Sequence, residues 1–157
     1  IIQGYKYSIQ QNYEYTFQVD SDNQFKSNDF INIWKYHKDN FDLILGVRKK
    51  RNDPFLRVFL SKFILRYVIF SFVKRFIQDA NIPFRLIKNT FLKDFLDQID
   101  DKTLAPNILM SMYSKNFKEI NITHYARTTG EISWSIFKLY KFGKRLLFEI
   151  NTFKKKF

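Results

Sequence analysis

Short strand-like runs alternate with helix-like runs along this chain, and this alternation constrains its fold more than any other feature. Runs rich in β-branched and aromatic residues, typical of strands, occupy 15–19, 41–46, 83–87 and 118–123. Helical periodicity is expected over 2–11, from 27 or 28 to 38, 54–76, 89–98, from 103 or 106 to 113, and in one or two helices over 131–157. Strands separated by helices favour an α/β fold. No repeat or linker interrupts the pattern, so one domain is expected over residues 1–157.

The composition excludes several kinds of functional site and predicts the charge of the partners. The chain has no cysteine, which excludes disulfide scaffolds, thiolate zinc sites and cysteine nucleophiles. Its formal net charge of +12 predicts anionic partners, such as nucleic acid, phosphorylated substrates or an acidic membrane surface. No uncharged apolar stretch reaches the roughly 18 residues of a transmembrane helix, so none is expected.

The cations concentrate around the long helix expected over 54–76. From Gly46 to Arg75 there are nine basic residues and one acidic residue. The helix is apolar nearly all round, with Phe and Leu dominant and cations in between. This pattern favours an amphipathic helix in a membrane interface, where apolar side chains enter the acyl boundary and cations reach lipid phosphates. An anionic membrane surface is therefore an expected partner.

A pair of carboxylates follows the first strand-like run. Asp20 and Asp22, in the segment Asp-Ser-Asp-Asn-Gln, lie two residues apart. The carboxyl end of a strand faces the crevice in which α/β sheets bind ligands. Carboxylates this close repel each other unless a cation lies between them, and hard oxygen ligands select Mg²⁺ or Mn²⁺. The alternative interpretation is a polar turn, since Asp and Ser are common turn residues.

The order of motifs behind this pair resembles family 2 glycosyltransferases. The branch with the greatest similarity includes dolichyl-phosphate mannose synthase and bacterial polyprenyl-phosphate sugar transferases. The motifs span nearly the whole chain and are Val19-Asp20-Ser21-Asp22-Asn23-Gln24, Gly46-Val47-Arg48, Arg57 with Ser61, Asp79-Ala80-Asn81-Ile82-Pro83-Phe84-Arg85 and His124-Tyr125-Ala126-Arg127-Thr128-Thr129-Gly130-Glu131. Pro83 stands where many members have glycine.

The resemblance implies a partial Rossmann-like fold of the GT-A type. The first strand-helix-strand unit of that fold, which binds the nucleobase, has no counterpart here. The 157 residues are therefore expected to form the C-terminal two-thirds of a catalytic domain whose N-terminal part is missing, and to be inactive alone. The whole protein is expected to lie peripherally on the cytoplasmic face of a membrane.

The implied reaction is an inverting transfer from a UDP- or GDP-sugar to a polyprenyl phosphate or another lipid-linked glycan acceptor, in the synthesis of cell-envelope polysaccharides or glycoconjugates. The metal, Mg²⁺ or Mn²⁺, would be held by Asp20, Asp22 and Gln24, with Asp22 as the first ligand. Asp79 would serve the acceptor, as general base for a sugar hydroxyl or as a positioning group for a phosphate. The resemblance assigns phosphate oxygens of the donor or acceptor to Arg48, Arg57, Ser61, Arg85 and Arg127, with Asp79 as the alternative partner of Arg85.

Two other interpretations compete. A basic nucleic-acid-binding module is suggested by the net charge of +12 and by an aromatic fraction of 19%. The cations, however, cluster in a helix dense with Phe, Leu and Ile, which favours a lipid interface, so nucleic acid is not expected as a partner. The third interpretation is an inactive remnant of a truncated gene.

Overall fold

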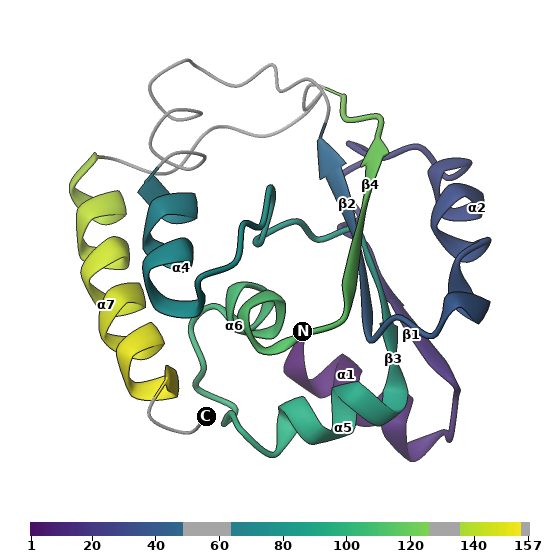
Figure 1. The fold of residues 1–157 in the computed structure, drawn as a ribbon, viewed down its shortest axis with the longest axis horizontal. Coiled ribbons are helices and arrows are strands. Elements are labelled where there is room, and N and C mark those ends of the chain that lie inside the picture. Colours follow the sequence, from purple (N-terminus) through teal and green to yellow (C-terminus); the bar gives the residue numbers. More distant parts are fainter. Residues whose placement is uncertain (49–63, 126–135, 155–157) are drawn as a thin grey trace.

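The computed structural model describes residues 1–48, 64–125 and 136–154 and has an α/β architecture (Figure 1). This confirms the α/β class predicted from the sequence. The elements are α1 (Ile2–Gln10), β1 (Tyr15–Gln18), α2 (Asp29–Trp34), the 3₁₀ helix η1 (His37–Asp39), β2 (Leu43–Arg48), α4 (Leu65–Val73), β3 (Arg85–Lys88), α5 (Asn89–Leu96), α6 (Pro106–Tyr113), β4 (Phe117–Ile122) and α7 (Ile136–Lys154).

The four strands form one mixed sheet in the order β1-β3-β2-β4. β3 runs antiparallel to both β1 and β2, whereas β2 and β4 are parallel. It follows that β1, β2 and β4 all point the same way, with β3 inserted against them. The carboxyl ends of these three strands and the amino end of β3 therefore meet at one edge of the sheet, called here the carboxyl edge.

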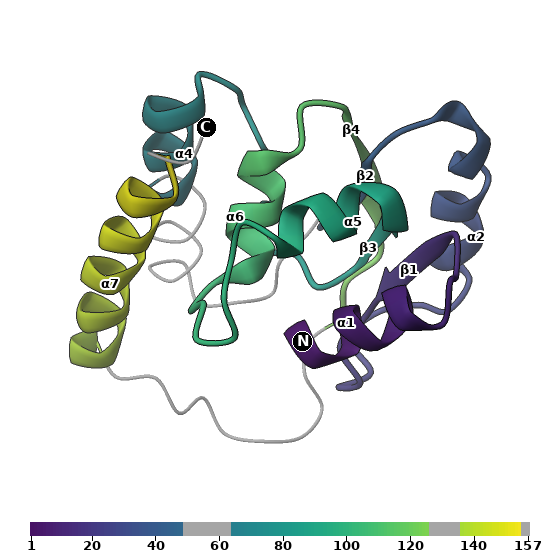
Figure 2. The ribbon, with the colours of Figure 1, turned by 90° about the horizontal axis from the view of Figure 1, so that it is seen from below.

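Helices cover the two faces of the sheet unequally (Figures 1 and 2). α2 lies on one face, and α1, α5 and α6 lie on the other. α4 and α7 form an outer layer beyond α6. The sheet supplies much of the core, because Leu43, Leu45, Leu86 and Ile87 are at most 2% exposed. Among the described residues, no helix combines the length and the apolarity needed to cross a bilayer.

Gly46 does not end β2 as the sequence suggested, since the strand continues to Arg48. The glycine is needed inside the strand for space. A Cβ atom at this position would lie 2.6 Å from Cδ1 of Ile122 and 3.1 Å from the carbonyl oxygen of Phe84. Its N–H also donates a 2.8 Å hydrogen bond to that carbonyl. Here glycine marks close packing between strands rather than a turn.

Helix ends differ from the expectation where the backbone turns early. The helix expected to reach residue 38 ends at Trp34 and is followed by η1. The described part of the 54–76 helix is α4, which ends at Val73 because Lys74 adopts a left-handed conformation with φ 54°. Of the two starts considered for α6, Pro106 is the observed one.

Candidate functional site

The carboxyl edge gathers most of the described residues that the sequence singled out. Asp20 follows β1, and Arg48 is the last residue of β2. The loop of residues 74–84, which carries Asp79, leads into the amino end of β3 at the same edge. On β4, Ile122 pairs with Arg48, so the residues after β4 also emerge here. Segments far apart in the sequence thus converge as the sheet topology requires.

The turn of residues 20–24 is held partly by its own carboxylate. The backbone N–H of Gln24 donates a 3.3 Å hydrogen bond to Oδ1 of Asp22. Asn23 between them is left-handed, with φ 59°. Asparagine tolerates this conformation better than most residues. The segment is therefore a polar turn, as the alternative interpretation held, and it still presents both carboxylates at the carboxyl edge.

Gln24 ties this turn to the segment after β4. Its carbonyl accepts a 2.9 Å hydrogen bond from the N–H of Tyr125, and its side-chain Nε2 donates a 3.1 Å hydrogen bond to the carbonyl of Tyr125. Phe25 and His124 form an antiparallel bridge beside it. Since the amide nitrogen of Gln24 serves Tyr125, its Oε1 atom remains as the acceptor suited to the predicted metal.

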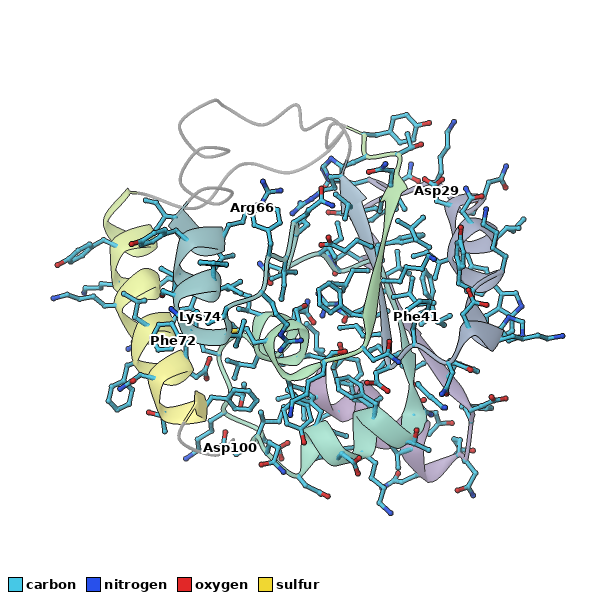
Figure 3. All side chains as sticks on the ribbon, in the orientation of Figure 1. Asp29, Phe41, Arg66, Phe72, Lys74 and Asp100 are labelled. Carbon is cyan, nitrogen blue, oxygen red and sulfur yellow. The ribbon has the colours of Figure 1, made fainter. Side chains whose placement is uncertain are left out.

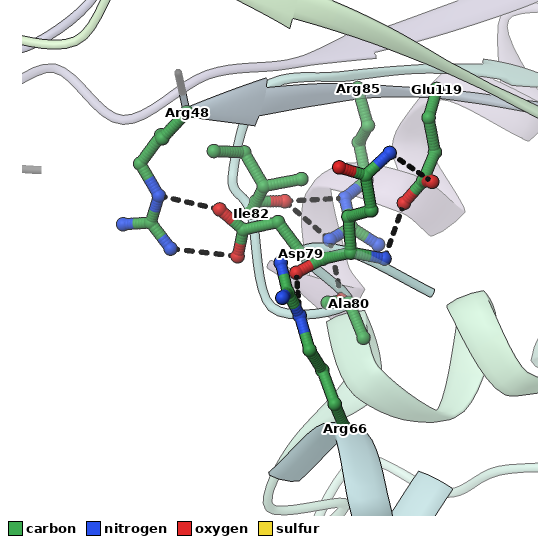
Figure 4. Close-up of polar contacts among 8 residues, drawn as sticks. Arg48, Arg66, Asp79, Ala80, Ile82, Arg85 and Glu119 are labelled. Atoms are coloured by element: carbon green, nitrogen blue, oxygen red, sulfur yellow. Dashed lines mark hydrogen bonds and ion pairs between the residues drawn. The ribbon is translucent and has the colours of Figure 1, made fainter. Parts of the chain in front are cut away.

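Arg48 and Asp79 form a bidentate ion pair at the carboxyl edge (Figure 4). Nε of Arg48 donates to Oδ2 of Asp79 at 2.6 Å, and the second nitrogen donates to Oδ1 at 2.8 Å. Each side chain is only 12% exposed. The predicted phosphate-binding arginine and the predicted acceptor-side carboxylate are therefore direct partners in this structure.

The loop of residues 74–84 is anchored from three further directions, two of them visible in Figure 4. Arg66 on α4 donates a 2.8 Å hydrogen bond to the carbonyl of Gln78. Glu119 on β4 accepts from the N–H of Gln78 at 2.6 Å and from its side chain at 3.1 Å. Arg75 donates to the carbonyl of Met112 at 2.7 Å. These bonds fix the loop that presents Asp79.

Arg85 lies inside the protein rather than at the ligand edge. It is 0% exposed, and its guanidinium donates to the carbonyls of Ile82 at 2.9 Å, Asn107 at 2.9 Å and Ala80 at 3.1 Å. A phosphate has no access to it in this structure, so its place differs from the predicted phosphate contact.

The pKa of Arg85 depends on its burial and on nearby ionisable groups. Burial lowers the pKa of Arg85 to about 10, while Tyr5, Asp79 and Asp20 act in the opposite direction. Burial disfavours the charged form of a base, whereas nearby negative charge favours it. Two of the predicted site carboxylates, Asp79 and Asp20, therefore favour the charged form of this buried arginine.

The ligands predicted for the metal are oxygen donors of the kind that Mg²⁺ and Mn²⁺ take. Among the described residues, no group of three or more His, Cys, Asp and Glu side chains could hold a metal by itself. Mg²⁺ is commonly bound by one or two carboxylates together with substrate phosphates. Asp20, Asp22 and Gln24 supply two carboxylates and one amide oxygen from a single turn, the number of carboxylates that this kind of site uses. The predicted phosphate contacts Arg57, Ser61 and Arg127 lie outside the described residues.

An aromatic hollow of about 460 Å³ opens beside the 20–24 turn. The rings that line it are Phe17, Phe25, Phe30 and Phe84. Asp20 and Lys26 are among its polar lining residues. Apolar walls with a few polar groups are typical of small-molecule sites.

Two residues that support the site were not singled out from the sequence. Asp29, which is labelled in Figure 3, is buried at the start of α2. Its Oδ2 atom accepts a 2.8 Å hydrogen bond from the N–H of Thr123 after β4. Glu119, which holds Gln78, was hidden in a weakly alternating strand. The only sequence signal for Asp29 was an acidic residue in a first helical turn, which is common.

Fold and site together define an α/β protein with an acidic turn and an arginine–aspartate pair at the carboxyl edge of a mixed sheet. A comparison with protein-family models finds no match. The chain is similar to uncharacterized protein MJ0544 of Methanocaldococcus jannaschii, with 33% identity over 101 residues. The match covers 60% of this chain and 44% of the relative, so the chain spans less than half of that protein's length.

Proposed function

We propose that this chain supplies the metal and acceptor parts of an inverting glycosyltransferase that uses a nucleotide-sugar donor. The observation that carries the proposal is the meeting of the Asp20–Asp22 turn and the Arg48–Asp79 pair at one carboxyl edge. An acidic turn suits a metal-bound diphosphate, and an arginine beside it suits a second phosphate. Open α/β sheets bind ligands at this edge.

The sheet agrees with a partial nucleotide-diphospho-sugar transferase fold of the GT-A type, which we propose as the finer fold class. β1 ends at the acidic turn, as the family resemblance requires of the strand before the Asp-x-Asp motif. β2 and β4 share its direction. The donor would be a UDP- or GDP-sugar.

In this proposal Asp22, Asp20 and Gln24 hold Mg²⁺ or Mn²⁺ together with the donor diphosphate. When bound, the metal supplies Lewis-acid neutralisation of the leaving diphosphate. The chain's own contribution is orientation. The hydrogen bond from Gln24 to Tyr125 directs the amide oxygen away from that carbonyl, and the bond from Gln24 N–H to Asp22 sets the angle of the carboxylate.

The Arg48–Asp79 pair favours an acceptor that is already an anion. Both carboxylate oxygens of Asp79 accept hydrogen bonds from Arg48. Asp79 therefore acts as a positioning residue for Arg48, which presents its remaining N–H groups to a phosphate. A polyprenyl phosphate needs no general base, so we favour it over a sugar hydroxyl. With such an acceptor, the protein would lie peripherally on the cytoplasmic face of a membrane and serve cell-envelope glycoconjugate synthesis.

The test is release of UDP or GDP from a panel of sugar nucleotides by the intact protein that contains this chain, with Mn²⁺ or Mg²⁺ and a polyprenyl phosphate acceptor. We expect Asp22→Ala to reduce turnover on the order of 100-fold, because a group that stabilises developing charge is lost. Asp97→Ala, at an exposed position after α5, is the matched control. Full activity in Asp22→Ala, or in the presence of EDTA, would contradict the metal assignment.

The acceptor assignment has its own comparison. Asp79→Asn keeps the shape of the side chain and removes its charge. If Asp79 positions Arg48, the variant raises KM for polyprenyl phosphate and lowers kcat little. If Asp79 takes a proton from a sugar hydroxyl, kcat falls and the lost rate does not return with more acceptor. The second result would replace the phosphate acceptor by a sugar hydroxyl.

A further inference from the structure

The outer helices carry apolar side chains that the described protein leaves uncovered. On α4, Tyr67 is 75% exposed and Phe70 is 46% exposed. On α7, the exposed apolar residues are Tyr140, Leu147 and Phe148, the last at 76%. α4 and α7 are neighbours in both ribbon views and form the layer farthest from the sheet (Figures 1 and 2). These five residues define the α4–α7 face.

Cations accompany these rings. Lys144 lies 5.1 Å from the ring centroid of Tyr140, and Lys74 lies 6.0 Å from that of Phe70. Lys141 and Arg145 are also exposed on α7. Aromatic rings with adjacent cations suit the boundary between acyl chains and phosphates, where rings insert and cations remain at the headgroups.

The charge of the face has one sign. α4 has no acidic residue, and α7 has a single one, Glu149. The carboxylate of Glu149 accepts hydrogen bonds from the N–H groups of Leu104 at 2.6 Å and Ala105 at 3.2 Å. It therefore serves the start of α6, where a negative charge is favourable. The acidic group of α7 is engaged by the protein, and the exposed charges of the helix are positive.

The α4–α7 face begins at the end of the molecule that carries the candidate site. In Figure 1 the first residues of α4 and α7 lie toward the same end of the molecule as the carboxyl ends of β2 and β4. That end carries the candidate site.

We propose that the α4–α7 face docks onto a bilayer that contains anionic phospholipid. A second copy of the chain is a poorer occupant, because a symmetric contact would oppose cations to cations. Nucleic acid is also poorer, because Leu147 and Phe148 favour burial in an apolar phase over a solvated backbone groove. This inference does not depend on the proposed glycosyl transfer.

The test is co-sedimentation of the chain with vesicles of phosphatidylcholine alone and with vesicles that contain about 30% phosphatidylglycerol. Binding is expected only with the second, and it weakens as salt rises. Leu147→Ser with Phe148→Ser removes apolar side chains, and Lys144→Glu with Arg145→Glu reverses charge. Each double variant is expected to lower the vesicle affinity about tenfold or more.

Matched controls lie on other helices. Ile31→Ser removes an apolar side chain that is 66% exposed on α2, and Lys93→Glu reverses an exposed charge on α5. Both should bind vesicles as the parent chain does, and circular dichroism confirms that every variant is folded. The proposal is overturned if the face variants bind as the controls do. It is also overturned if single-stranded DNA binds more tightly than the anionic vesicles, or if the face variants dissociate a dimer without changing vesicle binding.

Discussion

Arg48 and Asp79, which are 31 residues apart in the sequence, share two hydrogen bonds of 2.6 and 2.8 Å at the carboxyl edge of the sheet. The pair joins the end of β2 to the loop before β3. Each side chain is 12% exposed, so water screens the pair only partly. Its removal should therefore affect both the position of the loop and the stability of the fold.

We expect Asp79→Ala to lower the free energy of unfolding by about 1–3 kcal/mol, because Arg48 is left as a poorly solvated charge without its partner. Replacing both residues by alanine should cost less than the sum of the single changes. Urea denaturation of the two single variants and the double variant measures this coupling.

The ion pair between Lys6 and Asp101 is the control, since its side chains are 46% and 53% exposed. Removal of either partner should change stability by less than about 1 kcal/mol. If both pairs show the same coupling, the Arg48–Asp79 contact is a surface pair and the proposed positioning role is wrong.

Gly46 offers a second comparison. A Cβ at residue 46 would meet Cδ1 of Ile122 at 2.6 Å, whereas a Cβ at Gly143 in α7 would meet nothing within 4 Å. We expect Gly46→Ala to destabilise the protein by about 1–3 kcal/mol through overpacking. Gly143→Ala should stabilise it by about 0.5–1 kcal/mol, since alanine is the better helix former.

Ile122→Val tests the cause of the Gly46 effect. It removes the Cδ1 atom that the new Cβ would meet, so it should recover part of the stability lost in Gly46→Ala. Thermal unfolding of the combined variant measures the recovery. No recovery would locate the strain at the Phe84 carbonyl or at Cγ1 of Ile122, which lie 3.1 and 3.2 Å from the same Cβ position and remain in the combined variant.

The strands and helices were largely predictable because apolar periodicity is a local property of the sequence. The strand order was not, since the insertion of β3 between β1 and β2 depends on pairing between distant segments. Gly46 shows where local sequence patterns fail to predict the structure. A glycine after a short apolar run indicates a turn, and only the packing of Ile122 shows why it lies inside a strand.

The positions of some site residues could be predicted from the sequence, and those of others could not. Asp20, Asp22 and Arg48 reach the carboxyl edge because each lies at or just after the end of β1 or β2, which point the same way. That Asp20 and Asp22 follow a strand could be predicted from the sequence, whereas β2 was expected to end at Gly46. The burial of Arg85 could not be predicted, because its hydrogen bonds to Ala80 and Asn107 depend on how α6 packs against the loop. Burial of a cation is a tertiary property that spacing does not encode.

Arg85→Leu should lower the free energy of unfolding by about 2–4 kcal/mol, because the carbonyls of Ala80, Ile82 and Asn107 lose their donor. Arg85→Lys keeps a charge but replaces the planar fork by one head group, so it should restore only part of this loss. Arg66→Leu removes a single exposed bond to Gln78 and should cost less than about 1 kcal/mol. Equal losses at 66 and 85 in urea denaturation would contradict the anchoring role of Arg85.

Gln24 separates metal binding from loop positioning. Gln24→Glu keeps an oxygen for the metal but cannot donate to the carbonyl of Tyr125, whereas Gln24→Leu removes both functions. We expect Gln24→Leu to weaken Mn²⁺ binding about tenfold, and Gln24→Glu to weaken it less. Electron paramagnetic resonance of Mn²⁺, with a nucleoside diphosphate present, measures the affinity without turnover. Unchanged Mn²⁺ affinity in Gln24→Leu would limit Gln24 to tying the turn to Tyr125.

Tyr5 gives the stability a dependence on alkaline pH. Burial raises the pKa of Tyr5 from 10 to about 12, and its hydroxyl donates to Gln18 and to Asn107. Above pH 10 the unfolded chain loses this proton while the folded chain keeps it, so the contribution is complete below pH 10 and is lost as pH rises to about 12. Two pKa units correspond to about 2.7 kcal/mol at most. Tyr5→Phe removes this titration together with the electrostatic coupling between Tyr5 and Arg85, whereas the titration of the other tyrosines is common to both proteins. The free energy of unfolding of both proteins is measured by urea denaturation at successive pH values between about 9 and 12. The parent protein should be the more stable one below pH 10, and this difference should shrink as the pH rises to about 12. A constant difference would mean that Tyr5 has the same pKa in the folded and unfolded states.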